Sequence, residues 1–140
     1  MKLVAVFATL FAGAYAQGIN IGSPQEGSTI TTGDQTVQVR RPSTLTNSAE
    51  VAIVISIEAC NADGTCLDDT ESLGATLYNG PYHPQRQSGN NEPYQNFTVS
   101  IPDSLAGQKA LLSVVHLSLA DSGPFPLFQI VNATVHVDAN

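Results

Sequence analysis

Apolar and polar residues alternate along much of this chain with a period of two. In the segment "EVAIVISIEAC", Val51, Ile53, Ile55 and Ile57 fall on one face, and β-branched side chains run throughout. Such alternation is typical of a β-strand, and β-branched residues favour strands. Further candidate strands are "TVQVRRP", "GATLYN", "YQNFTVSIP", "KALLSVVHLSLA" and "LFQIVNATVHV". We find no heptads, internal repeat or long amphipathic helical pattern, so the sequence predicts an all-β chain.

Turn residues separate these segments and indicate how the strands are arranged. About seven short strands with turn signals between them predict an antiparallel β-sandwich of the immunoglobulin-like or fibronectin type III-like kind. The two longest strands, around Val114 and Val131, are joined by "DSGPFP" and should form a hairpin. Tryptophan is absent, and the two cysteines are too close in sequence for an inter-sheet bridge. The expected sandwich therefore lacks the hallmarks of antibody domains.

The first 16 residues have the three parts of a secretory signal peptide. Lys2 gives the positive start, Leu3 to Ala12 form the apolar run, and Ala14-Tyr15-Ala16 supplies the cleavage site. The apolar run is too short to span a bilayer, and no later segment is apolar enough to do so. We expect residues 17–140 to form one domain of a secreted, extracellular protein.

The charge of the predicted mature chain excludes two classes of partner. Without Lys2, four basic residues face twelve acidic ones, which gives a formal net charge of about −8. Binding to nucleic acid or to anionic membranes depends on Lys and Arg that neutralise phosphate. We therefore expect neither partner.

Cys60 and Cys66 lie on either side of an Asp63-Gly64 turn in "CNADGTC". In an oxidising compartment two such cysteines are expected to form a local disulfide. The closed loop is short, so the bond should stabilise the fold by only about 2–2.5 kcal/mol. Two thiolates without a nearby histidine make only half of a zinc site, and we predict no metal or cofactor.

Two sequons, Asn96-Phe97-Thr98 and Asn132-Ala133-Thr134, lie within predicted strands. In both strands one register turns the asparagine outward and the apolar neighbours inward. Because N-linked glycans need an exposed acceptor, this agreement predicts glycosylation of Asn96 or Asn132, or of both.

Candidate catalytic residues do not form a recognisable motif. His83, His116 and His136 show no metal-ligand spacing, and neither a G-x-S-x-G motif nor a Cys-His nucleophile pattern is present. We interpret His116 as a structural histidine and His136 as a solvated one. The copper-dependent polysaccharide monooxygenases need a histidine as first mature residue, where this chain has Gln17. These observations predict a protein that is not an enzyme.

The acidic segment "CNADGTCLDDTE" keeps two alternatives open. It lacks the spacing of an EF-hand, although its carboxylates could hold calcium weakly. Paired acids could also serve a glycoside hydrolase, whose two carboxylates must face each other across a cleft. The acidic side chains concerned are Asp63, Asp68, Asp69 and Glu71.

The stretch "YNGPYHPQRQSGNNEPYQ" is the longest irregular connection in the sequence. Long loops on rigid sandwiches often carry recognition, and tyrosines offer contact area at modest entropy cost. The alternative is a polar crossover whose tyrosines cover the edge of the sandwich. The candidate partner-binding residues are Tyr78, Tyr82, His83, Arg86 and Tyr94.

The order of segments resembles the fungal necrosis-inducing secreted protein family. The most telling pieces are "LYNGPYHPQ" followed by "PYQNFTVSIP", and the terminal "GPFPLFQIVNATV". The resemblance implies a secreted effector that contacts receptor-associated kinases of a host. It also suggests kinship to mushroom immunomodulatory proteins, which act on immune cells. The family supplies no catalytic residue to carry over.

Two functions therefore follow from the sequence. The first is a non-enzymatic effector or immunomodulatory protein that binds a host kinase or an immune-cell receptor through surface loops. The alternative is a carbohydrate-binding or wall-associated module that stacks polysaccharide on Tyr78, Tyr82 and Tyr94.

Overall fold

The structure is a computed structural model that describes residues 18–42, 48–68, 71–120 and 125–140. The predicted signal peptide lies outside these residues. Eight strands and one short 3-10 helix are present in the described chain. They are β1 (Asn20–Ser23), β2 (Thr29–Thr31), β3 (Gly33–Arg40), β4 (Ser48–Ala59), β5 (Ala75–Gly80), β6 (Tyr94–Ile101), η1 (Asp103–Leu105), β7 (Gln108–Ala120) and β8 (Phe125–Asp138).

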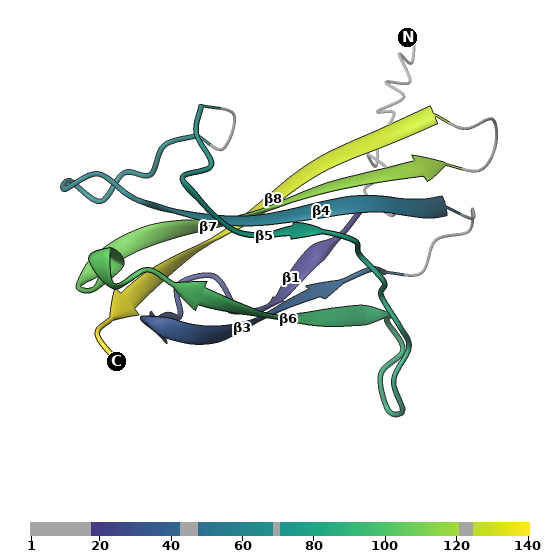
Figure 1. Ribbon diagram of the computed structural model, residues 1–140, viewed down its shortest axis with the longest axis horizontal. Helices are drawn as coiled ribbons and strands as arrows, with labels where there is room; N and C mark the ends of the chain where they lie inside the picture. Colours follow the sequence, from purple (N-terminus) through teal and green to yellow (C-terminus); the bar gives the residue numbers. More distant parts are fainter. Residues whose placement is uncertain (1–17, 43–47, 69–70, 121–124) are drawn as a thin grey trace, which may run out of the picture.

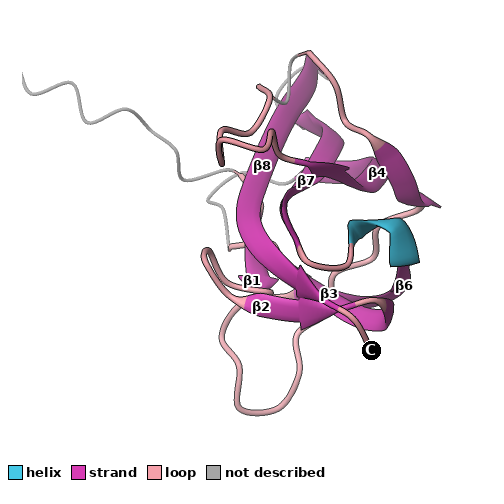
Figure 2. Cartoon of the chain, turned by 90° about the vertical axis from the view of Figure 1, so that its left-hand side faces the viewer, coloured by secondary structure: helices cyan, strands magenta, loops and turns pink. Residues whose placement is uncertain are grey.

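The strands form two sheets that face each other, so the predicted all-β sandwich is confirmed (Figure 1). One sheet has the order β1-β3-β6, and the other has the order β2-β8-β7-β4-β5. All pairings are antiparallel except that of β2 with β8, which is parallel. β8 curves so far that its last residues lie beside β2 (Figure 2). No helix of the described residues is long and apolar enough to cross a membrane.

The core lies between the sheets and follows the alternation of the sequence. On β6, Phe97, Val99 and Ile101 are buried, while Asn96 and Thr98 are exposed. The facing strands also bury alternating aliphatic side chains. Each fully buried Val, Leu, Ile or Phe side chain stabilises the fold by about 1.5–3 kcal/mol. The aliphatic side chains that β3, β4 and β7 bury are Val37, Val39, Ile53, Ile55, Ile57, Leu112 and Val114.

β4 departs from the predicted alternation at one residue. Val51 was expected on the same face as Ile53, but its side chain is 45% exposed. The reason is a bulge in the pairing with β7, where the register shifts between Glu50 and Ala52. A bulge inserts an extra residue into one strand and breaks the period of two at that point.

The predicted late hairpin is confirmed. β7 and β8 pair along their whole lengths, from Gln108 opposite Val137 to Ala120 opposite Phe125. β7 also pairs with β4, which makes it an inner strand of the larger sheet.

Candidate functional site

The disulfide loop after β4 is a compact turn. The predicted bond between Cys60 and Cys66 is present. Gly64 adopts a φ of 86°, a conformation that side chains disfavour, and its carbonyl accepts a hydrogen bond of 2.8 Å from Lys109 Nζ. Hydrogen bonds from the hydroxyl and backbone N–H of Thr65 hold the pKa of Asp63 below its usual value. Its carboxylate thus stabilises the turn.

Within the part of the chain that the structure describes, no metal site forms around this loop. Among the described residues, no three His, Cys, Asp or Glu side chains are close enough together to hold an ion. Asp69, one of the four acids of the predicted calcium-binding segment, lies outside the described residues.

Tyr82, predicted to contact a partner, is instead a core residue. Its side chain is 1% exposed, and its hydroxyl donates a hydrogen bond of 3.1 Å to the carbonyl of Val39. The ring lies 6.2 Å from that of Phe97 and meets that of His116 edge-on at 5.5 Å. Burial raises the pKa of the Tyr82 phenol well above its usual value. The predicted contact role of Tyr82 is wrong, because its ring packs between the sheets and is not accessible to a partner.

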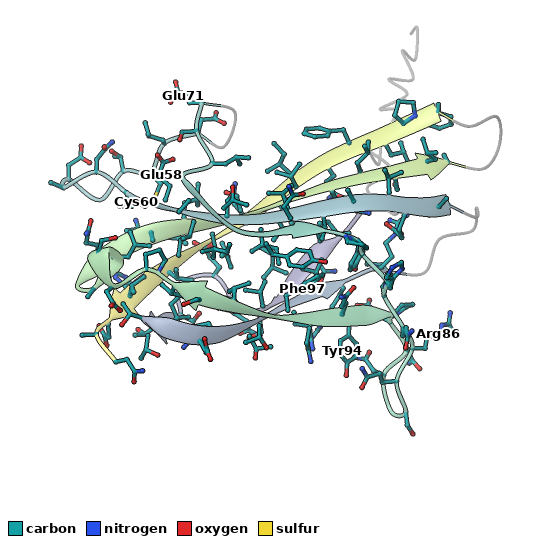
Figure 3. All side chains as sticks on the ribbon, in the orientation of Figure 1. Glu58, Cys60, Glu71, Arg86, Tyr94 and Phe97 are labelled. Atoms are coloured by element: carbon teal, nitrogen blue, oxygen red, sulfur yellow. A yellow bond between two sulfur atoms is a disulfide. The ribbon has the colours of Figure 1, made fainter. Side chains whose placement is uncertain are left out.

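The other four predicted contact residues differ in exposure. Tyr78 is half-buried, with its ring 4.7 Å from that of Phe97 and its hydroxyl bonded to the carbonyl of Pro81 at 2.7 Å. His83 and Arg86 are exposed, and Tyr94 is half-buried. Arg86 and Tyr94 lie near the start of β6, whereas Phe97 lies between the sheets (Figure 3). With Tyr82 buried, the three tyrosines do not form a common platform for stacking sugars.

A polar cluster that sequence reasoning missed lies beside Tyr82. Arg41 Nε donates to Glu50 Oε1 at 2.9 Å, and the second carboxylate oxygen contacts His116 Nε2. Arg41 also donates to Ser48 Oγ at 2.7 Å. The cluster links the end of β3 to β4 and β7. No sequence signal could reveal it, since Glu50 and His116 are 66 residues apart.

The electrostatics of this cluster favour an ionised carboxylate. Burial would raise the pKa of Glu50, but the hydrogen bond and charge of His116 together with Arg41 outweigh burial and lower it. The side chains of His116, Arg41 and Glu50 are 2%, 7% and 16% exposed. Both carboxylate oxygens already have partners within the fold. The arrangement therefore stabilises the sandwich, and His116 is structural, as interpreted from the sequence.

The larger sheet presents an apolar surface on its outer side. Three rows of cross-strand neighbours on β4, β7 and β8 contain only apolar side chains, and none of the nine is buried. Phe128 is the most prominent, with 67% of its surface exposed. We call this surface the apolar sheet face. Its rows are Ala49–Leu119–Pro126, Ala52–Leu117–Phe128 and Val54–Val115–Ile130.

The sequence did carry a signal for the apolar sheet face. In "SVVHLSLA" and "PLFQIVN" the outward positions Val115, Leu117 and Phe128 are apolar, whereas the inward positions include the polar residues His116, Ser118 and Gln129. A strand of a solvated antiparallel sheet should be polar on its outer face, whereas a strand covered on both sides is apolar on both. The outer positions of these two strands are therefore more apolar than those of a fully solvated sheet.

Both sequon asparagines are exposed, in the register that the sequence predicts. Asn96 lies on the outer face of the smaller sheet, opposite Gln38 of β3. Asn132 lies opposite Ser113, in the row that follows Val115 and Ile130, and so borders the apolar sheet face. The two predicted glycans would stand on different sheets.

Comparison with known proteins gives a family match. A family model described as the Nis1 family matches residues 13–136, almost the whole chain. This is a family of the necrosis-inducing secreted type, so that part of the sequence resemblance is confirmed. Kinship to mushroom immunomodulatory proteins stays a prediction. No curated protein matches the sequence.

Proposed function

This chain belongs to the Nis1 family of small secreted effector-like proteins, and from that premise we propose that it is a non-enzymatic effector that binds a signalling protein of its host. The partner class that the resemblance implies is a receptor-associated kinase or an immune-cell receptor. The family match and the local disulfide are both consistent with an extracellular protein.

The apolar sheet face is the observation that supports this function best. Contiguous exposed apolar surfaces on small proteins commonly mark interaction sites. Aromatic side chains at the centre of such surfaces tend to supply much of the binding energy, and Phe128 occupies the middle row. The chain carries 12 acidic residues against 5 basic ones, so a partner surface with an apolar centre and a basic rim would complement it.

The apolar sheet face replaces the loop as the proposed contact surface. The sequence pointed to loop residues around Tyr82, and the burial of Tyr82 leaves that loop with fewer accessible groups. A rigid sheet face also loses less conformational entropy on binding than an irregular connection does.

The proposal is tested with the protein secreted from yeast and a panel of receptor-associated kinase domains and immune-cell receptor ectodomains. We expect saturable binding to at least one panel member at micromolar concentration or below. Phe128→Asp should weaken that binding at least about tenfold, because a carboxylate would be desolvated in an apolar contact. Absence of saturable binding across the panel would contradict the effector function.

Thr36→Asp is the matched control. Thr36 is exposed on the outer face of the smaller sheet. The substitution therefore introduces the same negative charge as Phe128→Asp, but away from the apolar sheet face. The Thr36→Asp variant should bind the panel member with the affinity of the native protein. Both Thr36→Asp and Phe128→Asp should unfold at the native midpoint. If His83→Ala weakens binding and Phe128→Asp does not, the partner binds at the loop and the proposed surface is wrong.

A further inference from the structure

β6 places the asparagine and threonine of one sequon in a line with the tyrosine that precedes them by two residues. Tyr94, Asn96 and Thr98 alternate with inward residues, so all three side chains leave the same face of the strand. Asn96 and Thr98 are exposed and Tyr94 is half-buried. The residues of β3 opposite them on this face are the polar residues Thr36, Gln38 and Arg40.

The residues beside Asn96 bind the oxygen of its side-chain amide and leave the nitrogen without a contact from them. Gln38 Nε2 donates to Asn96 Oδ1 at 3.2 Å, and Gln38 in turn accepts a hydrogen bond of 2.8 Å from Arg40 Nε. These contacts use the carbonyl oxygen of Asn96. They do not involve Nδ2, the atom to which an N-linked glycan is attached.

Tyr94 is fixed more firmly than a loop residue. Its backbone pairs with Arg40 of β3 on one side. On the other side it exchanges two hydrogen bonds with Gln85, of 3.0 and 3.1 Å. The backbone at Tyr94 is therefore held in the strand, two residues or about 7 Å from Asn96, and its side chain leaves the same face. A sugar linked to Asn96 Nδ2 can reach across that distance.

We infer that Asn96 carries an N-linked glycan whose first N-acetylglucosamine packs against the ring of Tyr94. The apolar C–H face of a sugar ring fits the electron-rich face of an aromatic ring, as other apolar and cationic groups do. In the transfer, Asn96 Nδ2 forms a bond to C1 of the sugar. The bond from C1 to the diphosphate of a lipid-linked donor breaks, and the amide proton is lost as the lipid diphosphate leaves.

The second sequon lacks this arrangement and serves as an internal comparison. Two residues before Asn132 on the same face of β8 stands Ile130, an aliphatic side chain of the apolar sheet face. A glycan on Asn132 therefore has no aromatic partner at the equivalent position. The inference goes beyond the proposed effector function and depends only on passage through the secretory pathway.

The test is a double-mutant cycle on full-length protein secreted from yeast and trimmed with endoglycosidase H to one sugar per site. Four proteins are compared by thermal unfolding: native, Asn96→Gln, Tyr94→Thr and the double variant. Mass spectrometry of the peptides should show occupied Asn96. Removing the sugar with Asn96→Gln should lower Tm by about 3–5 °C in the native background and change it little in the Tyr94→Thr background.

Two further variants make the result specific. Tyr94→Phe keeps the ring and should retain the full dependence of Tm on the Asn96 sugar. Asn132→Gln should change Tm by the same amount whether or not Tyr94 is present. An unoccupied Asn96, failure of the protein to reach the medium, or equal effects of Asn96→Gln in both backgrounds would overturn the inference.

Discussion

Glu50 is the residue whose removal should reveal most about how the fold is stabilised. Its carboxylate bridges Arg41 and His116, which come from different parts of the chain. A buried guanidinium without its carboxylate would be an uncompensated charge, and such losses cost several kcal/mol. The cluster also lies against Tyr82, so it fixes the position of that ring between the sheets.

Glu50→Gln should lower the free energy of unfolding by about 2 kcal/mol near neutral pH, because the amide cannot replace the charged hydrogen bonds. The folded-state pKa of Glu50 lies below the ordinary value of 4.5, so ionised Glu50 stabilises the fold at pH above 4.5. The difference between native and variant should therefore shrink as the pH falls from 4.5 through the lower folded value. Urea unfolding across this range measures it.

Glu58→Gln is the control for that measurement. Glu58 also lies on β4 and is likewise partly exposed, but its described partner is a neutral hydroxyl, Ser72 Oγ at 2.9 Å, and not a buried charged pair. The Glu58→Gln substitution should lower the free energy of unfolding by less than about 1 kcal/mol. A constant difference for Glu50→Gln down to strong acid would show that the carboxylate stabilises the fold by some route other than its charge.

Single side chains were the hardest feature to predict from the sequence. Tyr82 and Glu50 owe their surroundings to strands that are distant along the chain, and neither carries a local pattern that fixes its direction. Residues within regular strands were easier. The alternation around Asn96 correctly placed Phe97 in the core, because the pleat of a strand determines where each side chain points.

At the scale of elements, the predicted sandwich and its last hairpin were accessible from the sequence. Two features were not. The bulge at Val51 shifts the register within β4, and β1 and β2 are too short for alternation to separate them. The apolar residues of the outer face of β7 and β8 stand in the sequence, but their alternation does not show which face they occupy. That became clear only when the pairing and burial showed that three apolar rows adjoin on the outer side.

The disulfide closes the loop that follows β4 and should stabilise that loop alone. Cys60 and Cys66 close a loop of six residue steps at the end of β4, so their joint replacement by serine should cost about 2 kcal/mol. β4 remains paired with β7 over its length, so the variant should stay folded with native far-UV circular dichroism. Urea unfolding gives the cost, and loss of the folded state on reduction would contradict a purely local role.

The whole molecule has two unlike outer faces. The smaller sheet presents polar side chains and the sequon with Tyr94, which suits a glycan. The larger sheet presents the apolar sheet face, with the second sequon at its border. On this account one side of the effector faces solvent and sugar while the other meets its protein partner.

Site-specific photo-crosslinking decides whether the apolar sheet face contacts the partner. A benzoylphenylalanine placed at Phe128, and separately at Thr36 and His83, is irradiated in the presence of the panel member that binds the native protein. The account predicts a covalent complex from position 128 and little from positions 36 and 83. Crosslinking from position 36 or 83 with none from position 128 would contradict it.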